Sequence, residues 1–583
     1  MADKKSASFV QSLCLGEIEE EIVIPFPEMK RAEKETLAEV LASVRRLVSG
    51  REKDFREWDR SGEMPSSFVD ELRSFGLFGL VIPEAYGGLG FGSAAYSRVL
   101  QEVAQYDSSV ALTIGAHSSI GMRGLLLFGT DAQKERFLPE LASGQRIAAF
   151  CLTEPGAGSD AAAVRTTARR DGDDWILNGE KIWITNGGMA DFFTVFAKTP
   201  EVKTGEHKAA MTAFLVTRDM PGVSTGAHED KMGIRASSTT TVTFSDVRVP
   251  RDHVLGELGQ GFKAAMRILN AGRTGLGGGS VGGMKKLIAL ASRQAKDRHQ
   301  FGRAIAEFGM VQEKVGLMVV DCFAAESVVS MVAGLIDQGY EDYAVEAAIS
   351  KVFSTEALWR TADEALQIAG GSGYMRELPY ERAIRDSRIN RIFEGTNEIL
   401  RLFIALTAMN DVGAQLKELA TAVRNVADPI KGFGVLSGYA RRRASIATGL
   451  VGEKRAFTLL HPEVKDAAQV VEEGTRDLAA AADRILRKHG GQIVGKQFAT
   501  KRLADILIDL FVLSCVLSRV NSAVEEKGEK GAGRELEILG VFSSRARRRM
   551  RSNVNRIDDN DDDLVKSLAN HAFESEGYAW DTL

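Results

Sequence analysis

The chain has 583 residues, of which 44% are hydrophobic and 26% are charged; this composition is typical of a globular protein, and the length predicts two to four domains. Its 79 acidic and 74 basic side chains give a net charge of −5, which does not favour nucleic-acid binding because phosphate contacts need a basic excess. The longest uninterrupted apolar runs fall short of the ~18 residues that a membrane span needs. Four scattered cysteines, and eight histidines without paired spacing, predict neither a disulfide framework nor a metal site.

Residues from about 26 to 141 have a helical pattern. Leu37, Leu41 and Val44 recur at steps of three and four residues, as one buried helix face requires. A Gly- and Pro-rich connection interrupts this pattern at residues 77–90. We therefore predict an N-terminal helical domain over residues 1–147.

The hydrophobic period changes to two between about residues 148 and 254. Asn178-Gly179 lies between two alternating segments and predicts a hairpin, because a type I′ turn needs positive φ at both central positions. Further strands are expected over 192–198, 213–217 and 239–244. A compact antiparallel sheet or barrel over residues 148–258 fits this pattern.

Helical periodicity returns after Gly259 and continues to the end of the chain. We expect a helical bundle domain over residues 259–410 and a C-terminal helical domain over 462–583. The intervening residues 411–461 are rich in Gly, Ser and basic side chains and predict a linker or a mobile helix pair.

The glycine-rich run Gly277–Gly282 matches two motifs: GxGxxG, which is typical of dinucleotide binding, and GxSxG, which is typical of a nucleophilic serine. Both motifs need a preceding strand to aim the backbone or the serine. The surrounding pattern is helical on both sides. Close packing of helices through small residues is therefore the better interpretation.

A first candidate segment for chemistry is Phe150–Asp160. Pro155, Gly156 and Gly158 impose an irregular backbone that a ligand can approach closely. Thr153 and Ser159 add short hydroxyl groups, and free N–H groups can meet a polar ring edge or phosphate oxygens. By composition alone, this segment fits a structural turn as well as a binding site.

The second candidate segment is Arg391–Arg401. Gly395 and Thr396 indicate the break and N-cap before a helix, so Glu394 lies just before a helix N-terminus, beside Phe393. A carboxylate at this position is either a surface anion stabilised by the helix dipole or a general base in an apolar pocket, with a small neighbour leaving room for substrate. The residues leave both interpretations open.

The order of these segments resembles the acyl-CoA dehydrogenase family over about residues 30–410. The very-long-chain branch of that family is similar in the segments Gly115-Ala-His117, Lys231–Ile234 and Ile349–Lys351, and in its extra C-terminal helical domain. The motifs that carry the family resemblance are Leu152–Asp160, Trp183–Gly188, Arg298–Gly302, Gln367–Gly371 and Ile392–Asn397.

This resemblance implies a mainly α fold with a central β-barrel, made of an N-terminal helical domain, an antiparallel β-barrel and a four-helix bundle, followed by a C-terminal helical domain. It implies FAD as the cofactor and Glu394 as the catalytic base. The implied cofactor-binding residues are Phe150, Cys151, Leu152, Thr153, Ser159, Trp183, Ile184, Thr185, Arg298, Phe301, Gln312, Gln367, Gly370, Gly371, Thr396 and Glu398. The implied substrate-binding residues are Ser159, Asn270, Arg273, Phe393 and Gly395. Asn270 stands where several relatives have an acidic residue.

The implied reaction is the FAD-dependent α,β-dehydrogenation of a long or very-long-chain fatty acyl-CoA to the trans-2-enoyl-CoA, the first step of fatty-acid β-oxidation. Electrons would then pass to electron-transfer flavoprotein. Two alternatives remain: an acyl-CoA oxidase, which hands electrons to oxygen, and an assembly or scaffold paralogue with secondary catalysis.

Ala111 and Gly115 lie four residues apart, on one face of a predicted helix. In the very-long-chain branch a similar small-residue stretch leaves the acyl cavity open, so we expect a long acyl chain. The same residues would also serve helix–helix packing.

The C-terminal extension implies a homodimer, because relatives without it commonly form tetramers through a bundle face that it would cover. Apolar and basic residues within 429–455 suggest peripheral contact with an anionic membrane, and a solvated linker fits them equally well. Met1–Lys5 is too polar for a signal peptide and too poor in arginine for a transit peptide. We therefore expect a cytoplasmic protein. If residues 429–455 contact a membrane, the protein would lie peripherally at the inner face of that membrane. If the chain is a processed eukaryotic protein, we expect it to be mitochondrial.

Overall fold

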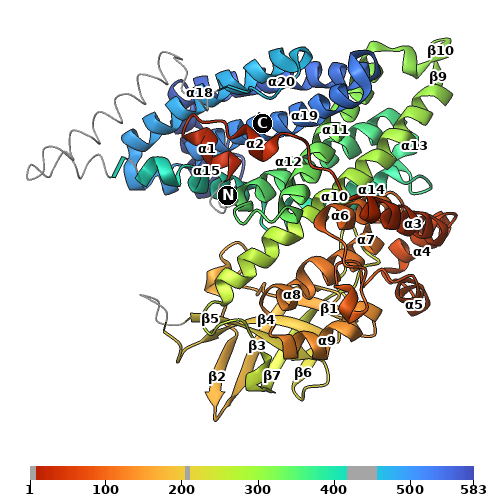
Figure 1. The fold of residues 1–583 in the computed structure, drawn as a ribbon, viewed down its shortest axis with the longest axis vertical. Coiled ribbons are helices and arrows are strands. Elements are labelled where there is room, and N and C mark those ends of the chain that lie inside the picture. The colour runs from red at the N-terminus through yellow and green to blue at the C-terminus, as the bar shows by residue number, and fades with distance from the viewer. Residues whose placement is uncertain (1–7, 204–209, 415, 418–455, 583) are drawn as a thin grey trace, which may run out of the picture. The chain divides into compact units, whose positions relative to one another are not determined.

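The computed structural model describes residues 8–203, 210–414, 416–417 and 456–582. Two compact units are present (Figure 1). The first contains Phe26–Ile399, and the second combines Ala7–Pro25 with Leu400–Leu583.

The first unit begins with helices whose apolar faces form a common core. On the longest of them, α3, the periodic residues Leu37, Leu41 and Val44 are buried, as their spacing predicts. The Gly- and Pro-rich connection at 77–90 contains only a short 3₁₀ turn. The helices are α3 (Arg31–Val48), α4 (Glu52–Ser61), α5 (Ser66–Ser74), α6 (Ser93–Ala104), α7 (Ser108–Gly115), a π-helical turn η3 (Ala116–Gly121), α8 (Arg123–Phe128) and α9 (Asp131–Ser143).

An eight-stranded sheet follows, in the order β6-β7-β3-β2-β4-β5-β8, with β1 paired to β4. The sheet is mixed rather than wholly antiparallel, because β1 and β2 both pair in parallel with β4. Every side chain of β5 is buried, including the hydroxyl-bearing Thr212 and Thr217. The strands are β1 (Ala148–Cys151), β2 (Thr167–Asp171), β3 (Asp174–Thr185), β4 (Phe192–Thr199), β5 (Ala210–Thr217), β6 (Val223–Thr225), β7 (Thr239–Val249) and β8 (Val254–Leu255).

The hairpin predicted at Asn178-Gly179 is wrong. Strand β3 runs straight through both residues, and the chain reverses earlier, at Gly172, where Asp171 pairs with Asp174. Gly179 instead marks a register shift against β7. A Cβ at Gly179 would lie 2.4 Å from Thr166 Oγ1, so the glycine permits a close approach of strands rather than a turn.

Long helices complete the first unit. Helices α10 (Gly261–Asp297), α11 (Gly309–Asp337) and α12 (Ala344–Ala369) pack against one another, and α6 packs against α10 and α11. The glycine run inside α10 serves this packing, as predicted: a Cβ at Gly278 would lie 2.5 Å from Ser97 Oγ, and one at Gly282 would lie 2.2 Å from the Gln101 carbonyl oxygen. The remaining elements are β9 (His299–Gln300), β10 (Arg303–Ala304), α13 (Gly371–Tyr374), α14 (Tyr380–Arg388) and the 3₁₀ turn η7 (Ile389–Arg391). Helix α15 (Asn397–Ala408) begins in this unit, and its residues from Leu400 onward belong to the second unit.

The second unit is helical and includes the N-terminal segment of the chain. Helices α1 (Phe9–Cys14) and α2 (Glu20–Val23) pack on α18 (Lys465–His489) and α19 (Gln497–Gly531), and α20 (Gly533–Asp558) packs on both of the long helices. Sequence patterning did not predict that the N-terminal segment belongs with the C-terminal unit.

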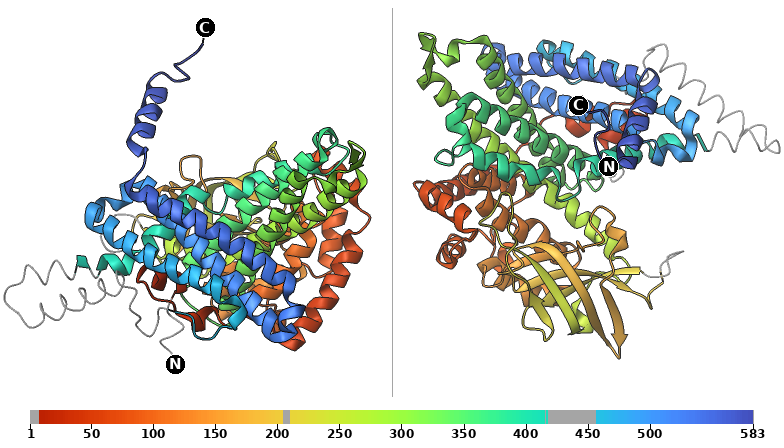
Figure 2. Two further views of the ribbon diagram at one scale, coloured as in Figure 1. Left: turned by 90° about the horizontal axis from the view of Figure 1, so that it is seen from above. Right: turned by 180° about the vertical axis from the view of Figure 1, so that it is seen from behind.

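The last helix of this unit, α21 (Asp562–Glu574), has no buried residue, and it carries the dark blue end of the chain in Figure 2. The membrane-contact segment predicted at 429–455 lies outside the described residues. The predicted domain boundaries remain predictions.

Two described segments, Ser108–Phe128 and Gly309–Asp337, are long and apolar enough on average to cross a membrane. In the apolar window of each segment, 67% and 72% of the residues are buried inside the protein. Polar residues interrupt the apolar sequence in both segments, so neither contains an uninterrupted apolar run of this length. Their apolar character is explained by burial in the helical core of the first unit.

Candidate active site

Glu394 occupies a strained turn between η7 and α15. Its φ angle is +54°, and Gly395, which follows it, has φ +93°. Left-handed backbone at a non-glycine residue costs on the order of 1–3 kcal/mol and persists where the surrounding structure enforces it. Thr396 caps the next helix, as predicted: its Oγ1 accepts a hydrogen bond from the N–H of Ile399 at 3.3 Å. The turn therefore holds the carboxylate immediately before a helix start.

The carboxylate of Glu394 lies over Gly272 of α10. A Cβ at Gly272 would be 3.4 Å from Glu394 Oε2 and 2.8 Å from Ile120 Cγ2, so the absence of a side chain leaves room for the carboxylate. Glu394 Oε2 is buried and has no hydrogen-bond partner among the described residues. Desolvation raises the pKa of Glu394 to about 7, although the nearby cations Lys351 and Arg273 oppose this shift. A carboxylate with this pKa is suited to accept a proton near neutral pH.

Arg273 is buried beside this carboxylate, with only 6% of its surface exposed. Its Nη1 donates a hydrogen bond to Asn270 Oδ1 at 2.6 Å. Desolvation lowers the pKa of Arg273 to about 10, and the charge of Glu394 opposes that shift. The structure thus brings the predicted residues Asn270, Arg273 and Glu394 together, and it places Arg273 near the candidate base.

The loop predicted to bind the cofactor follows β1 and is fastened by a buried ion pair. Lys181 Nζ contacts Glu154 Oε1 at 2.7 Å and donates to the Leu152 carbonyl at 3.1 Å. The same carboxylate accepts hydrogen bonds from the hydroxyl and N–H of Thr166 and from the N–H of Arg165. Burial opposes ionisation, but these donors lower the pKa of Glu154 below its ordinary value. The loop is therefore a fixed element.

Residues of this loop differ in exposure. Cys151 and Leu152 are buried, Phe150 and Thr153 are half-buried, and Ser159 is exposed. The Thr153 carbonyl accepts the N–H of Ile182 at 3.0 Å, which ties the loop to β3. Thr153 and Ser159 are therefore accessible to a ligand, whereas the buried Cys151 and Leu152 anchor the loop in the core.

The side chain of Trp183 points away from the core of the sheet because β3 is irregular at this point. The register with β7 shifts between Lys181 and Ile184, and Trp183 has φ +56°. As a result its side chain is 64% exposed, whereas Ile184 is buried in the core of the sheet. Thr185, two residues on, is half-buried. An exposed indole on a fixed strand offers a flat apolar surface to a planar ring.

Several predicted cofactor residues lie at exposed ends of the long helices. Phe301 is at the tip of the β9–β10 hairpin, with φ +54° and 94% of its surface exposed. The other exposed members of this group are Arg298, Gln312, Gln367, Gly370, Gly371 and Glu398. The predicted substrate residues Phe393 and Gly395 are half-buried next to Glu394.

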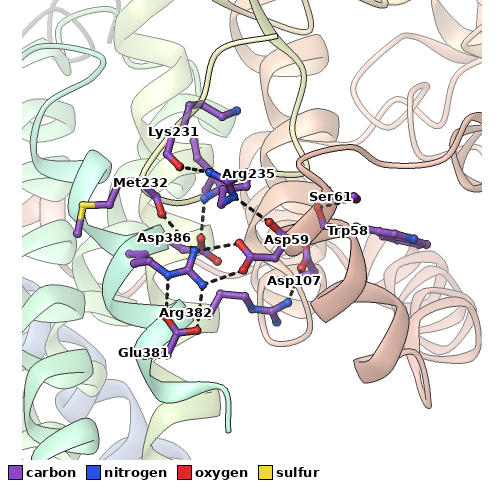
Figure 3. Close-up of polar contacts among 12 residues, drawn as sticks. Trp58, Asp59, Ser61, Asp107, Lys231, Met232, Arg235, Glu381, Arg382 and Asp386 are labelled. Carbon is purple, nitrogen blue, oxygen red and sulfur yellow. Dashed lines mark hydrogen bonds and ion pairs between the residues drawn. The ribbon is translucent and has the colours of Figure 1, made fainter. Parts of the chain in front are cut away.

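A polar network anchors α14, the helix that leads to the Glu394 turn (Figure 3). Arg385 binds both carboxylate oxygens of Asp59, at 2.7 and 3.0 Å, and also pairs with Glu381. The buried Asp386 accepts the N–H of Ile234 at 2.5 Å, and desolvation raises its pKa to about 7. Residues from α4, from the loop before β7 and from α14 meet here. The network therefore fixes the position of the helix that precedes the candidate base.

Comparison with known proteins bears on this arrangement. Four family models match successive parts of the chain: Acyl-CoA dehydrogenase, N-terminal domain (residues 34–145), middle domain (149–247) and C-terminal domain (259–409), and the ACAD9/ACADV C-terminal domain (462–578). The human "Very long-chain specific acyl-CoA dehydrogenase, mitochondrial" is 43% identical over 562 residues, which cover 95% of this chain and 84% of that protein.

The chain belongs to the acyl-CoA dehydrogenase family.

Solved structures agree with this membership. An acyl-CoA dehydrogenase from Bacillus anthracis complexed with FAD has a TM-score of 0.79 at 31% identity, over 94% of this chain and 92% of that one. A chain in a structure titled as the electron transferring flavoprotein of Acidaminococcus fermentans has a TM-score of 0.61 at 34% identity, over 65% and 98% of the two chains. The predicted family, its fold class and an FAD-dependent acyl-CoA dehydrogenase activity are confirmed at the level of the family.

Sequence reasoning about this acyl-CoA dehydrogenase missed several residues that shape the site. Gly272 could not be distinguished from the other glycines of its helix. Tyr96 has the sequence pattern of an ordinary core residue, but its pKa is raised by burial and further by the Glu394 carboxylate. Lys351 lies in the segment Ile349–Lys351 that carries the branch resemblance, but no role in the site was predicted for it. The sequence signal for a buried functional lysine of this kind is its position: the helical period places a charged residue on the buried face of the helix.

Proposed function

We propose that this acyl-CoA dehydrogenase removes the α-proton and β-hydrogen of a long or very-long-chain acyl-CoA, with Glu394 as the general base. The observation that carries the proposal is the buried Oε2 of Glu394 above Gly272, which finds no hydrogen-bond partner in the described part of the chain, with the pKa of the carboxyl raised to about 7. A base works best when its pKa lies near the operating pH. Bound FAD would supply the hydride acceptor for the hydrogen that leaves the β-carbon.

The thioester α-proton is weakly acidic, so the site must also stabilise the enolate oxygen. The N–H of Glu394 makes no backbone hydrogen bond with the described residues, and it is the donor that we assign to this oxygen. A preorganised donor of this kind contributes about 2.7–4 kcal/mol. The half-buried Phe393 next to it helps to exclude water.

The residues present fit FAD. Trp183 offers an exposed flat surface beside the accessible Thr153 and Thr185. A Cβ at Gly156 or Gly158 would meet no atom within 4 Å, so a ligand can approach this backbone closely. We assign the ring-binding surface to these residues and the phosphate and adenosine contacts to the exposed group that includes Arg298, Gln312 and Gln367.

A long acyl chain is favoured by the small residues of α7. Gly115 precedes the π-helical turn, and a Cβ there would stand 3.7 Å from Leu100 Cδ1 and 3.9 Å from the Tyr96 hydroxyl. A larger side chain at Gly115 would enter this space. The very-long-chain name of the human relative supports the same substrate class. A specificity profile that peaks at four to eight carbons would contradict it.

Electron-transfer flavoprotein is the proposed electron acceptor, and a structural neighbour carries that protein's name in its title. The oxidase and assembly alternatives are separated by one assay on purified protein, in which turnover is compared with electron-transfer flavoprotein and with oxygen. Faster turnover with oxygen supports the oxidase. Loss of turnover with both acceptors in a flavin-loaded protein supports an assembly role.

A homodimer is proposed as well. The exposed apolar side chains Phe301, Met310 and Tyr374 are close in sequence to the predicted cofactor contacts Arg298, Gln312 and Gly371, and a partner subunit would cover them. Sedimentation at equilibrium checks the assembly state. The mitochondrial name of the human relative supports the mitochondrial alternative if the chain is eukaryotic.

Glu394→Gln tests the assignment of the base. The amide keeps the shape of the side chain but cannot accept the proton, so kcat should fall on the order of 10²–10⁴-fold while FAD remains bound. The wild-type kcat/KM should rise with pH up to about 7, because the base must be deprotonated. Comparable turnover in Glu394→Gln with a long-chain acyl-CoA would overturn the assignment.

A further inference from the structure

Lys351 is a fully buried lysine in the middle of α12. None of its surface is exposed, and its neighbours on the helix are Ser350, Val352 and Ser354. A buried ammonium group is costly unless several acceptors satisfy it. Its position therefore calls for an explanation in terms of what it binds.

Lys351 binds the turn that carries the proposed base and also Asn397, the first residue of the following helix α15. Its Nζ donates to the Gly395 carbonyl at 2.8 Å and to Asn397 Oδ1 at 2.8 Å. The orientation of Asn397 is fixed in turn, because its Nδ2 donates to Thr355 Oγ1 at 3.2 Å and to Glu356 Oε1 at 3.1 Å. Helix α12 thus binds the backbone immediately after Glu394. The two successive residues with positive φ are Glu394 and Gly395.

We propose that Lys351 is the positioning residue of the catalytic base: it clamps the left-handed Glu394–Gly395 turn to α12 and places a positive charge beside the carboxylate. This inference rests on the proposed role of Glu394. The clamp keeps the carboxylate over Gly272 rather than letting the turn relax to an unstrained conformation. The charge favours the deprotonated form of the base.

The charged groups that act on Lys351 come from the turn, from α10, from α12 itself and from α15. They are Glu394 in the turn, Arg273 on α10, Glu356 on α12 itself and Glu398 on α15. Desolvation lowers the pKa of Lys351 to about 7, while the Glu394 charge opposes the shift. Conversely, Lys351 is the larger of the two influences that lower the pKa of Glu394 against desolvation. Removing the lysine should therefore raise the pKa of the base.

Lys351→Met and Lys351→Arg, both studied in the FAD-loaded full chain, test the proposal. In Lys351→Met, kcat should fall roughly tenfold to a hundredfold, since small misplacements of a catalytic group have effects of this size. KM should change little, and the acid limb of the kcat/KM profile should move to higher pH. Lys351→Arg retains the charge with displaced donors, so it should lower kcat while leaving the acid limb in place.

Lys285→Met is the matched control, because Lys285 pairs with Glu326 between α10 and α11 in the same bundle and does not contact the Glu394 turn. It should leave both kcat and the acid limb unchanged. A Lys351→Met protein with wild-type kcat, or one that loses kcat with an unmoved acid limb, overturns the proposal. If Lys351→Met does not fold, Lys351→Arg decides alone, and wild-type kcat in that variant overturns the clamp. Failure of the base assignment is recognised separately, by turnover in Glu394→Gln.

Discussion

The backbone of Glu394 holds the proposed base in a strained turn. Glutamate rarely adopts positive φ, yet three of the predicted site residues, Trp183, Phe301 and Glu394, do so. Strain of this kind persists where the surrounding structure over-determines the conformation, and it clusters at active sites. The helix cap at Thr396 was readable from the sequence, but the left-handed turn and the buried charges around it depend on contacts with α10 and α12, which are distant in sequence.

Gly272→Ala is expected to impair this site directly. Its Cβ would stand 2.8 Å from Ile120 Cγ2 and 3.4 Å from Glu394 Oε2, so either the turn or the π-helical segment must shift. Overpacking of this kind costs about 1–3 kcal/mol. Steady-state kinetics should show kcat lowered by about tenfold or more, with the FAD content unchanged.

Gly279→Ala on the same helix is the control for this prediction, because a Cβ there would meet no atom within 4 Å. It should raise the free energy of unfolding by about 0.4–1 kcal/mol through the unfolded state. Equal activities of the two variants would show that the space above Gly272 does not matter to the base.

The strand β3 shows how a local signal can be correct about the residue and wrong about the element. Asn-Gly predicts positive φ and Gly179 has it, but the neighbouring strands β2 and β7 hold the chain extended through that point. Most helices, strands and the change of period were predictable, because they follow from hydrophobic spacing. The bulge that aims Trp183 outward was not, since it depends on pairing with β7.

Glu154→Gln should loosen the loop Phe150–Asp160, which is predicted to bind the cofactor, without disturbing the helices. The amide keeps one acceptor oxygen, while its NH₂ group would face either the N–H of Arg165, which binds Oε2, or the N–H of Thr166, which binds Oε1. The charge that pairs with Lys181 would also be lost. Leaving buried donors unsatisfied costs about 1–3 kcal/mol each. Flavin fluorescence should therefore show faster release of FAD, with far-ultraviolet circular dichroism unchanged.

The pH dependence of this loop has a defined sign. The pKa of Glu154 is lowered in the folded protein, so its contribution to stability is present above the pKa of the unfolded chain and is lost as pH falls through the lower folded value. FAD release from the wild type should accordingly accelerate at acid pH, and Glu154→Gln should lack this acceleration. Unaltered FAD retention in the variant at neutral pH would contradict a supporting role for the carboxylate.

The division of the chain into two units has a consequence for the N-terminus. Hydrophobic patterning locates the C-terminal helices, but it does not show that residues 8–25 complete their core. Phe9 is fully buried, with its ring centroid 6.1 Å from that of Phe511. Ser518 Oγ donates a hydrogen bond to the Val23 carbonyl. These contacts join the two ends of the chain within one unit.

Phe9→Ala should therefore destabilise the C-terminal unit although the substitution lies at the other end of the sequence. Truncating a buried phenylalanine costs about 3–5 kcal/mol, so limited proteolysis should cut within α18–α20 sooner in the variant than in the wild type. Flavin fluorescence should remain unchanged at temperatures below this opening, because the Glu394 turn and the cofactor-binding loop belong to the first unit. Phe573→Ala is the matched control, since that ring is 75% exposed on α21 of the same unit and its loss should not change the rate of cleavage. Equal cleavage rates for Phe9→Ala and Phe573→Ala would show that the N-terminal helix does not support the C-terminal core.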